Sequence, residues 1–287
     1  MAVPTSFLSE IVAVFGHPVA ENPTQYMHEK AFEALGLQWR YITLDVPAEK
    51  LDGAVSGMRA MNFAGANCTI PHKVAVIPLL DTLTEAALKI GAVNTIVRLS
   101  DGRLLGENTD GKGFIQAVSE TGLDLNGTNA VILGAGGAAR AISTELAIAG
   151  AQHITIVNRT PHRGSELAQQ VITRTGIESA SYEWKGEIDI EPETNLVVNA
   201  TNIGLFPNVA QAVPVNYGTI RSSMLVCDVI PNPPDTPFLK RAREQGAKTL
   251  DGLGMLVYQG AIAFKMWTGK DAPVDVMRKA LEEVFAA

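Results

Sequence analysis

Cysteine is scarce in this chain of 287 residues and occurs only at Cys68 and Cys227. The two thiols are far apart, and neither has a second cysteine or a histidine at metal-ligand spacing. This excludes a disulfide framework and gives no indication of a metal site. We therefore expect free, largely buried thiols and a reducing compartment, the cytoplasm.

Positive charge is also limited, with 23 Lys and Arg against 30 Asp and Glu and a formal net charge of -7. No run of basic residues appears, which argues against a nucleic-acid partner. No apolar run is long enough to cross a bilayer and no signal sequence precedes the first predicted strand, so we expect no membrane association. The remaining partner is a small-molecule substrate, bound by a monomer or homodimer.

Short apolar runs alternate with amphipathic ones in the first third of the chain. They predict strands at 11–15, 39–46 and 66–70, with helices at 24–35 and 48–61. This β-α-β pattern predicts parallel strands covered by helices. A short helix, a strand at 92–99, an Asp101-Gly102 turn and a polar segment at 106–110 follow, and then a bridging helix at 111–121.

The pattern restarts at residue 128 with the spacing of a doubly wound nucleotide-binding domain. Strands are predicted at 129–133, 153–157, 196–200 and 224–229, and helices at 137–149 and 161–173. Helices at 253–267 and 274–285 have no strand after them, so we expect them to return to the first domain. The predicted fold is α/β, with one domain from 1–110 and 251–287 and a Rossmann-like domain at 111–250.

A glycine-rich turn follows the first strand of this second domain. Gly134, Gly136 and Ala139 fit the GxGxxG/A spacing that brings a backbone close to a pyrophosphate, although such turns also occur for packing reasons. The next strand ends in Asn158-Arg159-Thr160, followed by Arg163, where an NAD-binding domain has a carboxylate. A guanidinium pairs with a 2′-phosphate, so these residues favour NADP over NAD. The alternative is that Arg159 and Arg163 simply form a solvated helix start.

Reduction of a carbonyl requires a proton as well as a hydride, and two residues suit this role. Lys73 follows a predicted strand at the edge where open α/β sheets bind ligands, and Asp110 precedes a helix. Taken alone, Lys73 is a surface lysine and Asp110 a helix N-cap; taken with the cofactor, they form a proton-transferring pair. Asn94 lies near them only if its strand neighbours the strand before Lys73.

Seven motifs together resemble the shikimate dehydrogenase family in the right order along the chain. They are Gly-Ala-Asn-Cys-Thr-Ile-Pro-His-Lys (65–73), Gly-Ala-Val-Asn-Thr (91–95), Asn-Thr-Asp-Gly (108–111), Gly-Ala-Gly-Gly-Ala-Ala-Arg (134–140), Asn-Arg-Thr (158–160), Asn-Ala-Thr-Asn-Ile-Gly-Leu (199–205) and Gly-Met-Leu-Val-Tyr-Gln-Gly-Ala (254–261). The resemblance implies a catalytic N-terminal domain completed by the C-terminal helices, a nucleotide domain, and an active site in the cleft.

The resemblance also implies roles for individual residues. Lys73 and Asp110 match the catalytic pair, and Asn94 and Gln259 match contacts to the substrate hydroxyls. The cofactor-binding residues are Gly134, Ala135, Gly136, Gly137, Ala138, Asn158, Arg159, Thr160, Arg163 and Thr201. We add Thr69 to the substrate-binding residues and Gly252 to the cofactor-binding ones.

Two departures from the family concern the substrate. The loop that usually reads His-Ser-x-Ser-Pro is Glu21-Asn22-Pro23-Thr24-Gln25, so Asn22 and Thr24 replace the two serines that hold the substrate carboxylate. Pro231 stands where a tyrosine is common. We expect an NADP-dependent oxidoreductase acting on a shikimate- or quinate-like hydroxylated cyclic carboxylate. The alternatives are the same chemistry on an amino-substituted or carboxylate-free ring, and a non-catalytic NADP-binding protein.

Overall fold

The computed structural model describes residues 7–286, which form two compact units. Unit 1 contains the described residues up to Thr109 and those from Gly260 onward, and unit 2 is Asp110–Gln259. The second division falls inside a continuous helix, whereas the sequence-based boundary was placed between residues 250 and 251. No linker marks this position because the helix runs through it without a break.

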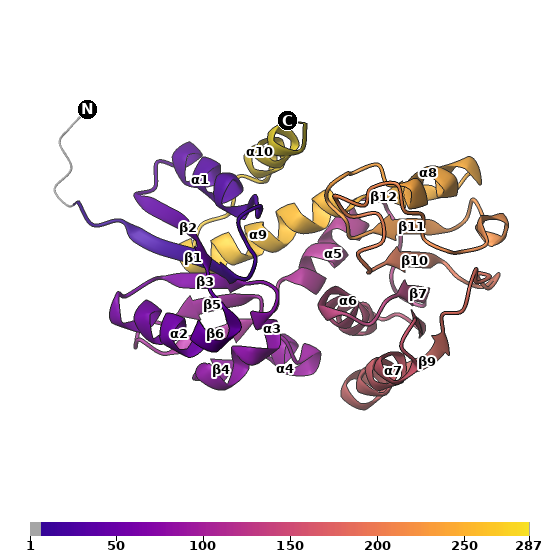
Figure 1. Ribbon diagram of the computed structural model, residues 1–287, viewed down its shortest axis with the longest axis horizontal. Helices are drawn as coiled ribbons and strands as arrows, with labels where there is room; N and C mark the ends of the chain where they lie inside the picture. The colour runs from indigo at the N-terminus through magenta and orange to yellow at the C-terminus, as the bar shows by residue number, and fades with distance from the viewer. Residues whose placement is uncertain (1–6, 287) are drawn as a thin grey trace. The chain divides into compact units, whose positions relative to one another are not determined.

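Unit 1 is built on a six-stranded sheet in the order β2-β1-β3-β5-β6-β4 (Figure 1). Its strands are β1 (Glu10–Gly16), β2 (Trp39–Asp45), β3 (Gly65–Cys68), β4 (Thr82–Leu83), β5 (Thr95–Arg98) and β6 (Leu104–Glu107). The helices of unit 1 that precede Thr109 are α1 (Thr24–Ala34), α2 (Leu51–Ala60), α3 (His72–Ala75) and α4 (Glu85–Ile90). The helix expected at 48–61 divides into a 3-10 turn (Ala48–Lys50) and α2.

The prediction of parallel strands for the first third of the chain is confirmed for β1, β2 and β3. No direction was predicted for the strand at 92–99, which is β5. This strand runs antiparallel to both β3 and β6. The reason is the turn at Asp101-Gly102, where Gly102 has a φ of +86° and the Asp101 carboxylate accepts the Arg103 amide at 3.1 Å. This tight turn makes a hairpin, and the first part of the segment expected to be a polar loop at 106–110 belongs to β6.

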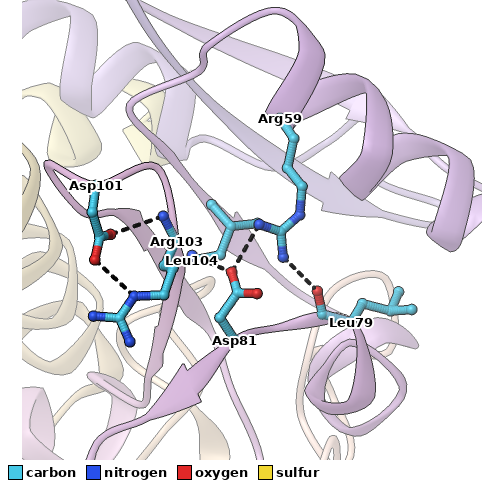
Figure 2. Close-up of polar contacts among 6 residues, drawn as sticks. All are labelled: Arg59, Leu79, Asp81, Asp101, Arg103 and Leu104. Carbon is cyan, nitrogen blue, oxygen red and sulfur yellow. Dashed lines mark hydrogen bonds and ion pairs between the residues drawn. The ribbon is translucent and has the colours of Figure 1, made fainter.

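Charged side chains fix the edge of this sheet, as Figure 2 shows. Asp81 accepts hydrogen bonds from the Leu104 amide at 2.7 Å and from Arg59 at 2.8 Å, and Arg59 also donates to the Leu79 carbonyl at 3.1 Å. The Leu104 amide and then the Arg59 guanidinium lower the pKa of the Asp81 carboxyl. The end of α2 is thereby tied to the edge formed by β4 and β6.

Unit 2 contains a fully parallel sheet in the order β12-β11-β10-β7-β8-β9. The strands are β7 (Asn129–Leu133), β8 (His153–Asn158), β9 (Glu178–Glu183), β10 (Leu196–Asn199), β11 (Leu225–Asp228) and β12 (Lys248–Leu250). The helices are α5 (Asp110–Ser119), α6 (Gly137–Ile148), α7 (Pro161–Thr175) and α8 (Pro237–Glu244). This order confirms the predicted doubly wound, Rossmann-like arrangement.

The last two helices are α9 (Gly252–Thr268) and α10 (Val274–Ala286). From Gly260 onward they belong to the first unit, as predicted for the C-terminal helices, whereas the first residues of α9 belong to unit 2. The Trp267 indole on α9 donates to the Ile96 carbonyl of β5 at 2.9 Å. Helix α10 packs along α1, and the Tyr26 hydroxyl donates to Glu283 at 3.1 Å (Figure 1). Among residues 7–286, no helix combines the length and apolar character that a membrane span requires.

Candidate active site

Lys73 and Asn94 lie side by side in unit 1. The Val93 amide donates to the Lys73 carbonyl at 2.7 Å, and the Cys68 amide donates to the Asn94 carbonyl at 2.8 Å. The segment before β5 therefore runs beside the one that joins β3 to α3, which meets the condition that the sequence set for Asn94. Burial raises the pKa of the Cys68 thiol to about 12, and the positive charge of Lys73 opposes this shift.

The side chain of Asn94 is buried and oriented by hydrogen bonds. Its Oδ1 accepts from the Thr109 amide at 2.8 Å and from the Thr95 hydroxyl at 2.9 Å, and its Nδ2 donates to the Thr109 hydroxyl at 3.0 Å. Asn94 is 3% exposed, while Thr95 and Thr109 are fully buried. These contacts hold the residue that directly precedes Asp110 in the chain.

A second layer of polar groups lies behind Asn94. The Asn67 amide donates to the Asn94 carbonyl at 3.0 Å and to the Thr95 hydroxyl at 3.1 Å, and Asn67 Oδ1 accepts the Tyr41 hydroxyl at 2.7 Å. All of these groups are buried. Because buried polar groups are costly unless paired, this chain of bonds fixes one orientation of the Asn94 amide. Burial raises the pKa of Tyr41 well above its ordinary value, so Tyr41 is a hydrogen-bond donor here.

The loop between β1 and α1 shapes the other predicted substrate contacts. Asn22 Oδ1 accepts the Thr24 backbone amide at 2.9 Å, an Asx turn at the start of α1. Thr24 is 5% exposed, and Glu21 is exposed. A few residues away, a Cβ at Gly16 would lie 2.4 Å from Thr69 Cγ2. Glycine at this position gives Thr69 the space it needs at the end of β3.

Asp110 and Gln259 lie in unit 2, on α5 and α9 respectively. A Cβ at Gly113 would lie 2.6 Å from the backbone nitrogen of Gln259, and one at Gly111 would lie 2.5 Å from the backbone carbonyl oxygen of Ala141. The two glycines after Asp110 therefore let α5 pack closely on both α9 and α6. Asp110 and Gln259 are 7% and 8% exposed, so both side chains are held in place.

The glycine turn after β7 has the geometry expected of a pyrophosphate site. Gly134 has a φ of +114°, and its missing Cβ would lie 2.9 Å from the Ala200 carbonyl, so glycine is required for packing. A Cβ at Gly136 would meet nothing within 4 Å. Gly136 is the N-cap of α6, and within the described part of the chain no side chain caps this helix. The exposed Gly137 and the half-buried Ala135 and Ala138 line the same turn. The open space and the uncapped amides fit a pyrophosphate.

The end of β8 gathers positive charge. Asn158 Nδ2 donates to the Thr160 carbonyl at 2.9 Å, and the Arg163 amide donates to the same carbonyl at 3.1 Å. This turn exposes the side chains of Arg159 and Arg163. Burial lowers the pKa of the Arg140 guanidinium, the charges of Arg174 and Arg163 lower it further, and Glu166 opposes the shift. The positive charges of Arg163 and Arg174 beside the partly buried Arg140 suit an anion such as a 2′-phosphate.

Thr201 is positioned by a buried amide and carboxyl pair. Its hydroxyl donates to Asn199 Oδ1 at 2.7 Å, and Asn199 Nδ2 donates to Asp228 at 3.0 Å. Burial raises the pKa of Asp228 to about 6. A Cβ at Gly252 would lie 2.5 Å from the Val229 backbone, so this glycine permits close packing beside the segment that leads to Pro231. Its predicted contact with the cofactor stays a prediction.

Several residues of this arrangement were not assigned a role from the sequence. Asn67 stood within a recognised motif, but nothing in its spacing linked it to Tyr41, whose partner is 26 residues away. Arg140 was the last residue of the glycine motif and was read only as part of the pattern. The sequence feature that could have identified such supporting residues is a polar side chain near the carboxyl end of a buried strand, as at Asn67 and Asn199. Among residues 7–286, no group of His, Cys, Asp and Glu has the geometry to hold a metal ion.

Three family descriptions match the chain. They are "Shikimate dehydrogenase substrate binding domain" over residues 14–96, "Shikimate / quinate 5-dehydrogenase" over 116–202, and "Shikimate 5'-dehydrogenase C-terminal domain" over 252–282. The matches follow one another along the chain and include Lys73, the glycine turn and Gln259.

Similar proteins cover nearly the whole chain. The shikimate dehydrogenase (NADP(+)) of Methanopyrus kandleri is 46% identical over 279 residues, which cover 96% of each protein. The ligand-free 5-ketofructose reductase of Gluconobacter sp. strain CHM43 has a TM-score of 0.93 at 46% identity, covering 98% of this chain and 100% of that one. Shikimate 5-dehydrogenase from Thermus thermophilus in complex with NADP(H) and shikimate has a TM-score of 0.84 at 36% identity, covering 96% and 99%. The chain therefore belongs to the shikimate dehydrogenase family.

Proposed function

We propose that the chain is an NADP-dependent oxidoreductase that interconverts a secondary alcohol and a ketone on a hydroxylated ring. The observation that carries this proposal is the adjacency of the segments that carry Lys73 and the oriented Asn94 amide, at the end of β3. In the second sheet, the open turn at Gly136 and the arginines near β8 suit a dinucleotide with a 2′-phosphate. Membership of a family whose relatives carry NADP(+) in their names supports the same cofactor.

NADP would be held by the amides of the glycine turn, by the turn at Asn158 and Thr160, and by Arg159 and Arg163. When bound, it supplies or accepts the hydride. Lys73 donates a proton to the carbonyl oxygen as the alcohol forms and takes it back in the reverse direction. We assign Asp110 as the second member of the proton-transferring pair, and Asn94 and Gln259 as the residues that orient the substrate hydroxyls.

We propose a shikimate- or quinate-like ring carboxylate as the first substrate class. The supporting evidence is the set of family matches and the retention of Lys73, Asp110, Asn94 and Gln259. The test is a substrate panel with purified protein, in which NADPH formation is followed with shikimate, quinate and related alcohols. Absence of NADPH formation with every ring carboxylate would refute this class.

The loop before α1 favours a second class, a polyhydroxylated carbonyl compound without a carboxylate. Asn22 Oδ1 is already bonded to the Thr24 amide, and the exposed Glu21 adds negative charge to the loop. A substrate without a carboxylate avoids repulsion from Glu21. The likeness to a 5-ketofructose reductase at 46% identity supports this alternative.

Exchange of the loop residues separates the two classes. Changing Asn22→Ser and Thr24→Ser restores the two hydroxyls of the family pattern, so the ratio of kcat/KM for shikimate to that for 5-ketofructose should rise. Thr268→Ser, at the end of α9, is a matched control, because its hydroxyl bonds to the Phe264 carbonyl of its own helix. An unchanged ratio in the loop variant would contradict a role of Asn22 and Thr24 in substrate choice.

We further propose that the protein works in the cytoplasm as a monomer or homodimer. The free, buried thiols of Cys68 and Cys227 support a reducing compartment. Light scattering on purified protein measures the oligomeric state, and a larger assembly would contradict this proposal.

A further inference from the structure

The connection from β9 to β10 leaves part of the second sheet without a helical cover. One face of β7 and β8 packs against α6 and α7, through buried residues such as Ile154, Ile156 and Leu167. The chain then crosses to β10 through residues 184–195, which contain no helix. Parallel strands are usually joined by a helix that covers the sheet. Here an irregular segment lies over the opposite face instead.

A cavity of about 480 Å³ lies beneath this segment, within the range of small-molecule sites. Its lining on the strands comprises Asn129, Ala130, Val131, His153, Thr155, Val157 and Tyr182, and its lining on the covering segment comprises Ile188, Asp189, Glu191, Glu193 and Thr194. Asn129 and His153 are the first residues of β7 and β8. The cavity lies on the face of the sheet shared by Thr155 and Val157, whereas Ile156 and Asn158 lie on the other face, against Gly164 of α7. One end of the cavity, at Val157 and Tyr182, adjoins Asn158, so binding is tested in the NADP-saturated protein.

Two hydroxyl groups lining the cavity lack hydrogen-bond partners within the described part of the chain. Thr194 is 6% exposed, and the hydrogen bond it makes is that of its backbone amide to the Glu191 carbonyl. Thr155 lies on β8 and is half-buried. Neither hydroxyl oxygen is among the fully buried unpaired atoms of the described residues, so both can be reached from the cavity. A bound ligand with polar hydrogens would satisfy these groups.

The charged side chains that line the cavity are mainly acidic. Asp189, Glu191 and Glu193 contribute carboxylates, whereas no lysine or arginine among the described residues lines the cavity. The Asp189 carboxylate also accepts a hydrogen bond from Asn216 at 2.8 Å. Tyr182 is 63% exposed and offers an aromatic face, and the strand valines form an apolar floor. Carboxylates and an aromatic ring attract an ammonium group, and the valines accommodate an apolar body.

We propose that this cavity is a second small-molecule site that binds an organic ammonium ion with an apolar or aromatic body. The ammonium group lies among the carboxylates of Glu191 and Glu193, and the body of the ligand lies on Val131, Val157 and the ring of Tyr182, which pairs with Val157. This site requires no catalytic residue, so it stands independently of the oxidoreductase function.

The test uses 2-phenylethylammonium and its acidic counterpart 3-phenylpropionate as probes, titrated calorimetrically into full-length protein saturated with NADP. The ammonium should bind at least about tenfold more tightly than the carboxylate, because the rim is acidic. Equal affinities, no binding of the ammonium, or displacement of the ammonium by NADP would overturn the proposal.

Variants locate the binding. Exchange of both rim carboxylates, Glu191→Gln with Glu193→Gln, should weaken binding of 2-phenylethylammonium roughly five- to tenfold and leave NADP affinity unchanged. Tyr182→Ala should weaken it as well, and this exposed side chain can be removed without disturbing the core. Glu244→Gln, an exposed carboxylate at the end of α8, is the matched control and should bind the probe as the unmodified protein does. Binding that none of the rim changes alters would refute the site.

Discussion

The buried histidine of α1 gives a prediction whose size follows from the structure. His28 is fully buried, and its ring stacks on Tyr41 with a centroid distance of 4.7 Å and an angle of 4°. Among the residues that the structure describes, neither ring nitrogen has a hydrogen-bond partner. Burial lowers the pKa of His28 from 6.5 to about 3. The folded protein therefore keeps this ring neutral in a pH range where the unfolded chain protonates it.

The sign and size of the effect follow from proton linkage. Below pH 6.5 the unfolded state binds a proton that the folded state does not, so the free energy of unfolding falls with decreasing pH until about pH 3. Each pH unit below pH 6.5 lowers the free energy of unfolding by about 1.36 kcal/mol. Between about pH 7.5 and about pH 5, His28 should therefore lower the free energy of unfolding of unit 1 by about 2 kcal/mol. Asp228 acts in the opposite direction, because burial raises its pKa to about 6 and the folded state binds the proton more readily.

Comparison with a variant isolates the histidine from Asp228. His28→Phe keeps an aromatic ring against Tyr41 and removes the titrating group. Urea unfolding followed by tryptophan fluorescence should show a loss of stability on acidification that is about 2 kcal/mol larger in the unmodified protein than in this variant. His162→Gln, at an exposed histidine on α7, should retain the pH dependence of the unmodified protein. An identical pH dependence in His28→Phe and unmodified protein would refute the reasoning.

Three further predictions concern the proposed site. Arg159→Ala should raise the Kd for NADPH about tenfold and change that for NADH less than about twofold, since an exposed charge-assisted hydrogen bond is lost; equal effects in fluorescence titrations would contradict the assignment. Lys73→Ala should reduce kcat by about 10²–10⁴ and leave NADPH affinity intact; near-normal turnover would exclude the proton-transfer role. Tyr41→Phe leaves Asn67 Oδ1 without its donor and should cost about 1–3 kcal/mol in urea unfolding, whereas unchanged stability would show that the hydroxyl bond contributes little.

Much of the fold was accessible from the sequence because its elements have strong periodicity. Strands such as β7 and helices such as α7 were predicted within two residues of their observed ends, since glycine and proline mark their limits. The hairpin of β5 and β6 was missed because Gly106 and Glu107 are poor strand formers. Glu107 is nevertheless buried, where its carboxylate accepts the Thr84 hydroxyl at 2.9 Å and the Asn108 amide at 2.7 Å.

Other elements escaped prediction for related reasons. The edge strands β9 and β12 contain only exposed or half-buried residues, so their hydrophobic patterns are weak. The helix α8 is only eight residues long and buries three of them, Phe238, Leu239 and Ala242. The helix α3 is only four residues long. Short or exposed elements depend on tertiary contacts that a local pattern does not contain.

The candidate site was predicted in its residue types and not in its supporting contacts. Motifs identified Lys73 and Asn94, and the adjacency of the two depended on a strand pairing that local pattern left open. The hydrogen bonds from Tyr41 through Asn67 to Asn94 join residues up to 53 positions apart. Long-range pairing of this kind follows from the sheet order, so the sequence alone left these contacts unassigned.

The most direct test of the central proposal is a comparison of kcat/KM with NADP and with NAD on the substrate panel, for unmodified protein and for Lys73→Ala. We predict NADP-linked turnover of a hydroxylated ring substrate, a clear preference for NADP, and loss of that turnover in Lys73→Ala with cofactor binding retained. Absence of turnover across the panel despite NADP binding, or full activity without Lys73, would contradict the account.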